Sequence, residues 1–402
     1  MSQLAKQIVC DGEGISKLIE VNISNAKSKI QANLPKFNQY TYKSAKIVGE
    51  ENSSFEDAVN TISESISELH EANKWSVGEQ HISLGLIRVT YVKDAIRLAR
   101  ALSEIRSDAY IATYHSREFL IQRHRKEKIL DSILSRKNGN NNLLNNKYVQ
   151  SLIDQSSSKD IPFIVIATPV EEVGRDHDFD WGIIEPNSAR SVVQTAGRIN
   201  RHRKIEISHH NIHILDRSFR CLHKHDCSTK AHYTNPGFET DVNWSQHDMT
   251  SLILKSEIES LNSTLRYGKS PLAELEDETL AQQLTKPIKA ICLEKGKAVR
   301  WMTEGFYRKH PLREKSKTTS ITLKDGLFNK RIINANGYCE WDDVDSSVNI
   351  IQEVESSWLN WSIDSLLDYA TRRGVSEEDA FYFEIYENKS NNITYDQSFG
   401  IF

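Results

Sequence analysis

The sequence predicts an α/β protein whose centre is a doubly wound parallel sheet. Short apolar segments typical of buried strands recur along the chain, and they are Ile82–Val89, Tyr110–Tyr114, Ile161–Ala167, Trp181–Glu185 and His210–Leu215. Helical patterns such as Val92–Ile105 separate them. Because strands that alternate with helices favour parallel pairing, we expect ligands to bind beyond the carboxyl ends of the strands.

Composition limits the classes of protein that need to be considered. The chain has 402 residues, of which 38% are hydrophobic and 26% charged, typical of a folded protein with two or three domains. The net charge of −4 means that a nucleic-acid site would need a local basic surface. The 5 irregularly placed cysteines favour a reducing cytoplasm over a disulfide framework. No apolar run approaches about 18 residues, so we expect no membrane association and a cytoplasmic location.

The stretch Ile164–Arg203 carries the strongest chemical signal in the chain. An apolar strand leads into Thr168, and a loop with Gly174 and alternating aspartates follows. A short helical segment then carries Arg198 and Arg201, which lie three residues apart and so share one helical face. Two guanidinium groups on one face can neutralise the charge that develops on a transferring phosphoryl group. The pattern therefore predicts a nucleotide phosphate on one side of the loop and a phosphate-rich polymer on the other.

These residues resemble motifs V and VI of superfamily 2 helicases. The segment Gln194–Arg201 matches the motif VI pattern Gln-x-x-Gly-Arg-x-x-Arg in full. The segment Ala167–Asp176 resembles motif V through its threonine, glutamate, glycine and aspartate. The resemblance implies the second RecA-like domain of a motor that binds ATP between two such domains. The alternative is an ordinary strand–helix unit with a charged surface helix.

Other segments resemble one family more narrowly, the CRISPR-associated helicase-nuclease of type I-F systems. The strand Ser83–Arg88 is similar to that family's Ser-Phe-Gly-Leu-x-Arg strand, and Tyr114-His115-Ser116 is similar to its Tyr-His-Ser segment. Pro236–Glu239 and Phe306–Lys309 also resemble the family. The resemblance implies a 3′–5′ single-strand DNA translocase that works in antiviral defence with the CRISPR surveillance complex.

The resemblance assigns roles to individual residues of this sequence. Arg201 is the expected transition-state finger and Arg198 the residue nearer the resting γ-phosphate. The remaining ATP contacts are expected from Gly174, Asp176, Gln194 and Gly197. The DNA contacts are expected from Thr168, Ser116, Arg117 and Arg88.

Several motor elements have no counterpart in this sequence. The chain has no P-loop: Gly268-Lys269-Ser270 has Ser263 where the pattern needs glycine. The Mg²⁺-binding Asp-Glu-x-His box and an HD nuclease are not visible either. We therefore expect the C-terminal part of the enzyme, in which ATP and Mg²⁺ act only with the N-terminal part of the helicase-nuclease. The alternative is a non-catalytic chain that binds DNA or the surveillance complex without ATP turnover.

We expect four segments along the chain. Residues 1–75 are a helical linker with the remnant of the first RecA-like domain, and residues 76–220 are the second RecA-like domain. Residues 221–250 are a His-rich linker. Residues 251–402 are an α-rich, mixed C-terminal accessory domain, with helices at 252–265, 274–284 and 354–367, short strands at 320–323 and 331–334, and a final strand segment at 381–402.

Four further patterns have both a functional and a structural interpretation. The run Cys221–Cys227 has zinc-ligand residue types without zinc-finger spacing, so we expect no metal site. The dipeptides His225-Asp226 and His247-Asp248 would suit a metal nuclease only with further ligands. Trp358 and Trp361 are expected in the core rather than as a base-stacking platform. In the basic stretch Arg117–Lys137, Arg117 is expected to contact DNA, whereas Arg136 and Lys137 are expected to be solvated.

Overall fold

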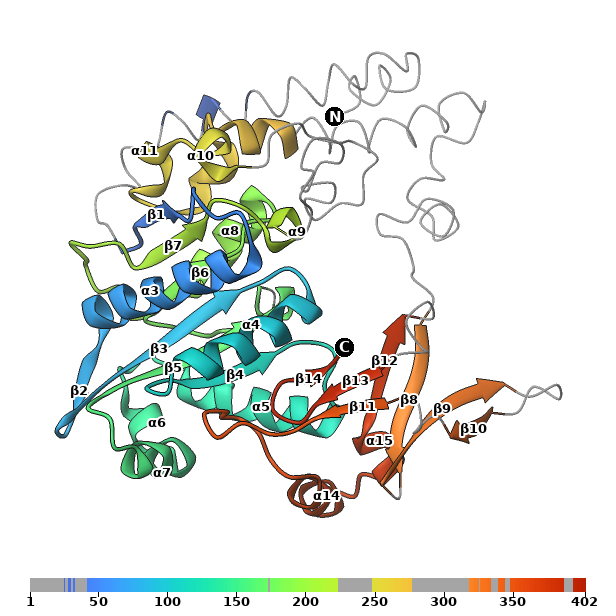
Figure 1. Cartoon of the computed structure of the whole chain (residues 1–402). Coiled ribbons are helices and arrows are strands. Elements are labelled where there is room, and N and C mark those ends of the chain that lie inside the picture. The colour runs from blue at the N-terminus through green and yellow to red at the C-terminus, as the bar shows by residue number, and fades with distance from the viewer. Residues whose placement is uncertain are drawn as a thin grey trace, which may run out of the picture.

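The computed structural model of the chain is built on one large sheet with two smaller sheets beside it (Figure 1). The structure describes positions 25, 28, 29 and 32 and residues 42–172, 174–222, 248–276, 318–324, 326–333, 339–343, 348–386 and 393–402. Several predicted features lie outside these residues, namely His223–Cys227, Pro236–Glu239, His247, the end of the predicted 274–284 helix, Phe306–Lys309 and the turn at Asn391-Asn392. Among the described residues, no helix combines the length and apolar character needed to cross a membrane.

The large sheet confirms the predicted RecA-like α/β class. Its strand order is β1-β7-β6-β3-β5-β4, all paired in parallel, and β2 adds to β3 as an antiparallel strand. The strands are β1 (Ala45–Val48), β2 (Trp75–Val77), β3 (Gln80–Arg88), β4 (Tyr110–Tyr114), β5 (Asp160–Ala167), β6 (Trp181–Ile184) and β7 (Ile212–Leu215). β3 and β5 are buried along most of their length, as expected for a parallel sheet covered on both faces.

Helices cover both faces of this sheet, so the predicted double winding is also confirmed (Figure 1). One face packs on α3 (Phe55–Asn73), α4 (Val92–Ile105) and α9 (Phe219–Leu222). The other packs on α5 (Leu120–Ile133), α6 (Asn141–Leu144), α7 (Lys147–Gln155) and α8 (Ala189–Ala196). Alternate residues of β5 supply the two cores: Val165 faces the second set of helices and Ile166 the first.

Close packing at the sheet centre requires a glycine. The indole of Trp181 in β6 lies against Gly85 in β3, where an added Cβ would come within 2.1 Å of the ring. The indole Nε1 of Trp181 donates to the Ser83 hydroxyl at 2.8 Å, which satisfies the polar atom of a fully buried ring. This contact fixes the register of β3 against β6.

The predicted boundary between a linker at 1–75 and the sheet domain is wrong. β1 pairs with β7 in the large sheet, and α3 buries Ile62, Ile66 and Leu69 against it. The side chains of Ser54 and Asp57 form a capping box that begins α3. The helical spacing in α3 was visible in the sequence, but the partner of its apolar face is formed by strands far along the chain.

The segment after residue 248 is broken where one long helix was expected. It forms α10 (Met249–Leu252), α11 (Lys255–Ile258) and the 3₁₀ helix η2 (Ser263–Tyr267) instead of a helix over 252–265. The backbone N–H of Leu254 donates to the Ser270 hydroxyl at 2.9 Å, and the Glu257 carboxylate accepts the backbone N–H of Lys269. Because these side chains compete for backbone groups, they interrupt the helical ladder.

The C-terminal region is mixed, as predicted, but its described part contains more strand than helix. A four-stranded sheet contains β8 (Thr318–Lys324), β9 (Leu327–Ile333), β10 (Cys339–Asp343) and β12 (Tyr382–Tyr386). A three-stranded sheet contains β11 (Val348–Ile351), β13 (Ile393–Asp396) and β14 (Gly400–Ile401). The helices are α14 (Ile363–Thr371) and α15 (Glu377–Ala380). The predicted strands at 320–323 and 331–334 correspond to β8 and β9.

The helix expected at 354–367 begins only at Ile363, because the preceding residues pair with the edge strand β4. The Ile111 N–H donates to the Ser356 carbonyl at 2.9 Å, and the Trp358 N–H donates to the Ile111 carbonyl at 3.1 Å. The Trp358 indole is buried at 5.0 Å from the Phe163 ring centroid. The predicted core role of Trp358 is therefore confirmed, and this segment anchors the C-terminal region to the large sheet.

Candidate functional site

The motif V loop, residues 168–178, connects two opposite edges of the large sheet. It begins at Thr168, whose backbone N–H donates to the Tyr114 carbonyl at the carboxyl end of β4 (3.2 Å). It continues through the 3₁₀ helix η1 (Pro169–Glu171) and ends where the Asp178 N–H donates to the Leu134 carbonyl (3.1 Å), just before β6. One loop thus extends from the carboxyl edge of the sheet to its amino edge.

Arg198, at the end of α8, holds this loop in place. Its Nε donates to the Glu171 carbonyl at 3.1 Å and one terminal nitrogen to the Glu172 carbonyl at 2.7 Å. The other terminal nitrogen donates to the Arg175 carbonyl. Burial, together with the nearby positive charge of Arg201, lowers the pKa of Arg198. Each of the three guanidinium nitrogens donates to a backbone carbonyl, so in this arrangement Arg198 positions the loop, and its contact with the γ-phosphate stays a prediction.

Arg201 differs from Arg198, because its side chain is 36% exposed. Its Nε lies 3.1 Å from the Asp176 carboxylate, which also pairs with Lys137 at 2.7 Å and His202 at 3.0 Å. The Lys137 hydrogen bond is the main cause that holds the pKa of Asp176 below its usual value, and the charges of His202 and Arg201 contribute. The structure therefore brings together two predicted ATP-side residues, Arg201 and Asp176.

The segment that carries Arg201 is fixed by a carboxylate that the sequence analysis did not assign to a role. Buried Asp178 accepts the backbone N–H groups of Arg201 at 2.9 Å and His202 at 3.1 Å, and it pairs with Arg203 at 2.9 Å. Burial alone would raise the pKa of Asp178, but the Arg203 hydrogen bonds and charge bring it below its usual value. The alternating aspartates were the only sequence signal for this position.

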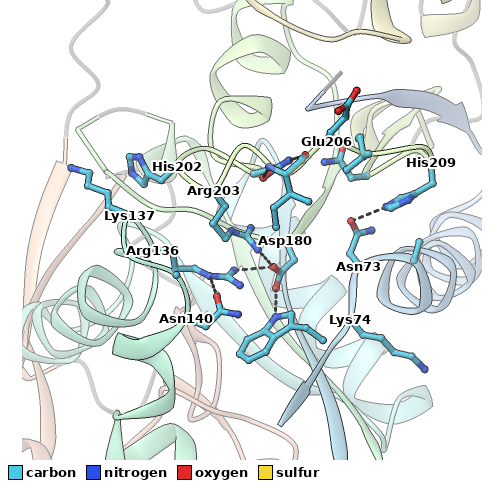
Figure 2. Close-up of a pocket in the computed structure, with 17 residues that line it drawn as sticks. Asn73, Lys74, Arg136, Lys137, Asn140, Asp180, His202, Arg203, Glu206 and His209 are labelled. Atoms are coloured by element: carbon cyan, nitrogen blue, oxygen red, sulfur yellow. Dashed lines mark hydrogen bonds and ion pairs between the residues drawn. The ribbon is translucent and has the colours of Figure 1, made fainter. Parts of the chain in front are cut away.

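A cavity of about 590 Å³ lies beside this charged network, at the amino edge of the sheet (Figure 2). Arg136 and Arg203 converge on Asp180 there, at 2.9 and 2.5 Å. Arg136 also donates to the Asn140 side chain at 2.8 Å and is completely buried. The prediction that Arg136 is solvated is therefore wrong, because Asp180, which comes from a distant part of the chain, pairs with it. Lys137 is exposed, as predicted.

The remaining ATP-side residues shape the backbone around Arg201. Gly174 has a φ of +76°, a conformation that favours glycine, at the turn of the motif V loop. Gly197 ends α8, and its N–H donates to the Val193 carbonyl at 2.9 Å. Gln194 is half-buried on the same helix.

The predicted DNA-side residues lie at the carboxyl edge. β4 and β5 are neighbours, so Ser116 and Arg117 after β4 lie beside Thr168 after β5. Ser116 is exposed, Arg117 is half-buried and Thr168 is buried. Arg88 ends β3 opposite Ala167, so the structure brings all four predicted DNA-side residues to one edge.

Arg88 differs from the other predicted DNA-side residues in its side-chain contacts. Its side chain is 1% exposed, and its Nε donates to the Glu172 carboxylate of the motif V loop at 2.7 Å. One terminal nitrogen donates to the Glu185 carbonyl and to the Thr90 hydroxyl, both at 2.9 Å. Because this ion pair is buried, the Arg88 guanidinium has no exposed surface that a phosphate could contact. Arg88 instead connects β3, β6 and the motif V loop.

The C-terminal residues dock on the loop that carries Ser116 and Arg117, which the sequence analysis did not foresee. The Phe399 carbonyl accepts from the Thr113 hydroxyl and from His115 Nε2, both at 2.8 Å, and the Ile401 N–H donates to the Arg117 carbonyl at 2.9 Å. Gly400 has a φ of +111°, and an added Cβ would lie 2.6 Å from the His115 ring. The tail thus fixes the shape of the predicted DNA loop.

The basic helix α5 behind this loop is less basic at its surface than its sequence suggests. Buried Lys126 donates to the Glu118 carboxylate and to the Thr113 carbonyl, both at 2.8 Å. Burial raises the pKa of Glu118, and the charge and hydrogen bond of Lys126 oppose that effect. Lys126 is therefore a structural cation.

Within the described ranges, no three His, Cys, Asp or Glu side chains group closely enough to hold a metal ion.

The parallel sheet, the loop after β5 and the segment after α8 have the arrangement of a RecA-like domain. Residues 81–204 match the family model described as the C-terminal region of the CRISPR-associated nuclease/helicase Cas3. This region is therefore similar to the C-terminal region of Cas3-type proteins, in agreement with the resemblance seen in the sequence.

Two curated relatives support the same assignment. The chain is 32% identical over 228 residues to the Cas3 nuclease/helicase of subtype I-F/YPEST from Pseudomonas aeruginosa, covering 54% of this chain and 21% of that protein. It is 36% identical over 193 residues to the subtype I-F/YPEST protein from Pectobacterium atrosepticum, covering 46% of this chain and 17% of that protein. The matched regions thus span about a fifth of the relatives' length.

Solved structures of T. fusca Cas3 are also similar to the chain. The AMPPNP complex has a TM-score of 0.41 at 11% identity, covering 90% of this chain and 40% of the other. A second crystal structure of T. fusca Cas3 has a TM-score of 0.42 at 10% identity, with the same coverage.

His115 predicts a specific pH dependence of stability. Complete burial, reinforced by the Lys126 charge, lowers its pKa to about 3. The unfolded chain takes up a proton near pH 6.5, whereas the folded chain does not, so the unfolding free energy falls as pH drops from about 6.5 to 3. We expect His115→Gln to reduce the loss of unfolding free energy between pH 7 and 5 by about 2 kcal/mol.

The measurement is denaturant unfolding at both pH values, with His81→Gln at a half-exposed position as the control. His213, whose pKa burial lowers to about 4, contributes with the same sign and stays unchanged in both variants. An unaltered loss of stability in His115→Gln would contradict a buried neutral imidazole.

Proposed function

We propose that this chain is the C-terminal part of an ATP-dependent, single-strand DNA translocase of CRISPR interference, comprising the second motor domain and an accessory region. The observation that carries the proposal is the motif V loop, which extends from the predicted DNA edge at Thr168 to the predicted nucleotide side at Asp176. Arg198 fastens this loop to the helix that precedes Arg201. A movement at either end of such a loop displaces the other end.

On the nucleotide side, the proposal gives the chain one wall of an ATP cleft. The half-exposed Arg201 can reach a phosphoryl group if it leaves Asp176, and that exchange replaces a carboxylate partner with a phosphate partner. Phosphoryl transfer also needs a phosphate cradle and Mg²⁺, which neutralises the charge on the phosphate oxygens. In this proposal the N-terminal part of the helicase-nuclease supplies both, so the 402-residue chain alone should not turn over ATP at motor rates.

On the DNA side, the proposal gives the chain a phosphate-contacting edge. Ser116, Arg117 and Thr168 follow neighbouring strands, where ligands of doubly wound sheets bind. The chain carries a net charge of −4, so a local positive group is needed to attract an anionic strand. The loop that carries Arg117 is held by the C-terminal tail, which supports a preorganised contact.

The two curated relatives are CRISPR-associated by name. We extend this context to the chain, with the CRISPR surveillance complex and the N-terminal part of the enzyme as its partners and the cytoplasm as its location. Binding to the surveillance complex without motor activity is the competing function. This competing function would be favoured if the motor, once completed with the P-loop-bearing part, hydrolysed no ATP in the presence of single-stranded DNA.

Arg201 provides the sharpest test of the motor proposal. In a motor completed with the P-loop-bearing part, Arg201→Ala should lower the ATP turnover rate about 10³-fold with little change in ATP affinity. Arg201→Lys should not restore turnover, because an ammonium lacks the planar fork. Steady-state ATPase kinetics with single-stranded DNA present measures both effects.

Lys137→Ala is the matched control for Arg201, since Lys137 also pairs with Asp176. We expect near-normal turnover in that variant. A normal turnover rate with a raised KM in Arg201→Ala would instead assign Arg201 to ground-state binding of ATP.

Phosphate binding at the carboxyl edge predicts a defined salt dependence. For about three neutralised phosphates, the logarithm of the single-strand DNA association constant should fall with a slope near −2 against the logarithm of salt concentration. Arg117→Ala should flatten this slope by about 0.7. Thr168→Ala should weaken binding but leave the slope unchanged, because a hydroxyl releases no counterion. Anisotropy titrations of a fluorescent oligonucleotide across salt concentrations give these slopes.

Lys137→Ala again serves as the control, because it removes one exposed positive charge at the opposite edge of the sheet. Its slope should equal that of the wild-type chain. Equal flattening by Lys137→Ala and Arg117→Ala would show a diffuse charge effect and not a site.

A further inference from the structure

An exposed aromatic ring follows the central strand of the sheet. Tyr91 comes three residues after the end of β3 and is 43% exposed. β3 lies between β6 and β5 in the sheet, so Tyr91 follows the strand next to β5, which ends at Ala167, just before Thr168. Neither the motifs nor the family resemblance assigns a function to this ring.

The backbone under Tyr91 is rigidly held. The Thr90 N–H donates to the Glu185 carboxylate at 2.5 Å, and the Thr90 hydroxyl accepts from Arg88 at 2.9 Å. On the other side, α4 begins directly after Tyr91. The backbone that carries the ring is therefore held between a buried ion-pair network and a helix. Such a fixed backbone suits a residue that contacts a ligand.

The same buried carboxylate holds a cation beside the ring. Glu185 also accepts the Phe219 N–H at 2.9 Å, at the start of α9. The next residue, Arg220, donates from one terminal nitrogen to the Tyr91 hydroxyl at 3.3 Å. Burial raises the pKa of Glu185, and the Arg88 charge opposes that effect. One carboxylate thus fixes both members of an aromatic–guanidinium pair at the surface.

We propose that Tyr91 is a stacking platform for a base of single-stranded DNA and that Arg220 contacts the adjoining phosphate. The inference rests on the proposed DNA-binding function and extends it along the carboxyl edge, from β4 and β5 to β3. Strand spacing of about 4.8 Å places the ends of β3 and β4 roughly 10 Å apart, since β5 lies between them. One short stretch of DNA can therefore meet Arg117, Thr168 and Tyr91.

The chemistry of the pair favours a nucleic-acid strand. Every base has a π-face, so a tyrosine ring binds bases without sequence preference, as a translocase requires. A guanidinium beside the ring adds a phosphate contact. The hydroxyl of Tyr91 holds Arg220, which leaves the ring as the part that contacts the base.

The test compares two oligonucleotides of equal length, one of thymidines and one of abasic sites, each titrated into the full chain. Tyr91→Ala should weaken binding of the thymidine strand about 5- to 100-fold more than binding of the abasic strand, the range for loss of one stacked base. Tyr91→Phe should retain the wild-type preference for the thymidine strand over the abasic strand, because it keeps the ring, and loss of the hydroxyl that holds Arg220 affects both strands alike. Arg220→Gln should flatten the salt slope by about 0.7 for both strands.

Leu327→Ala is the matched control, since Leu327 is a similarly exposed large side chain on β9. It should alter neither affinity, and the thermal midpoint of each variant should match the wild-type chain. If Tyr91→Ala leaves thymidine binding unchanged while Arg117→Ala weakens it, the stacking proposal is wrong and the DNA-binding function stands. Equal weakening on both strands would also overturn stacking. No binding by the wild-type chain would overturn both proposals.

Discussion

The buried guanidinium of Arg198 donates hydrogen bonds to three backbone carbonyls of the motif V loop. Charge-assisted hydrogen bonds of this kind are roughly twice as strong as neutral ones, and a buried charge without them would be costly. The loop has little regular structure of its own beyond η1, so its path depends on this contact. Thr168, predicted to contact DNA, and Asp176, predicted to contact the nucleotide, are therefore joined by one loop that Arg198 holds in place.

Buried ion pairs fix the rest of the site around that connection. Glu172 in the loop binds Arg88 at the end of β3, and Asp178 binds Arg203 after α8. Breaking such a pair by removing one partner leaves an uncompensated buried charge, which typically costs about 3–5 kcal/mol. The network thus connects the loop, the sheet edge and the Arg201 segment through buried ion pairs. The C-terminal tail holds the Arg117 loop at the same sheet edge.

Sequence patterns predicted the parallel sheet, because its strands are apolar runs separated by helices, and they located the motif V and VI segments. They could not predict which charges are buried. Arg88 and Arg136 look like surface cations in the sequence, yet acids at positions 172 and 180 bind them in the fold. For the same reason β1 and the C-terminal tail were assigned to other segments. Their partners on β7 and beside His115 are distant in sequence.

Hydrogen exchange of the motif V loop in Arg198→Lys tests the central role of Arg198 most directly. Lysine keeps the charge but cannot reach three carbonyls, so the loop amides between Thr168 and Asp178 should exchange at least about tenfold faster, as expected for loss of one or more charge-assisted hydrogen bonds. The amides of β5 should keep their protection, and Arg201→Lys should leave the loop unchanged. Unaltered loop exchange in Arg198→Lys, or equal acceleration in Arg201→Lys, would contradict the account.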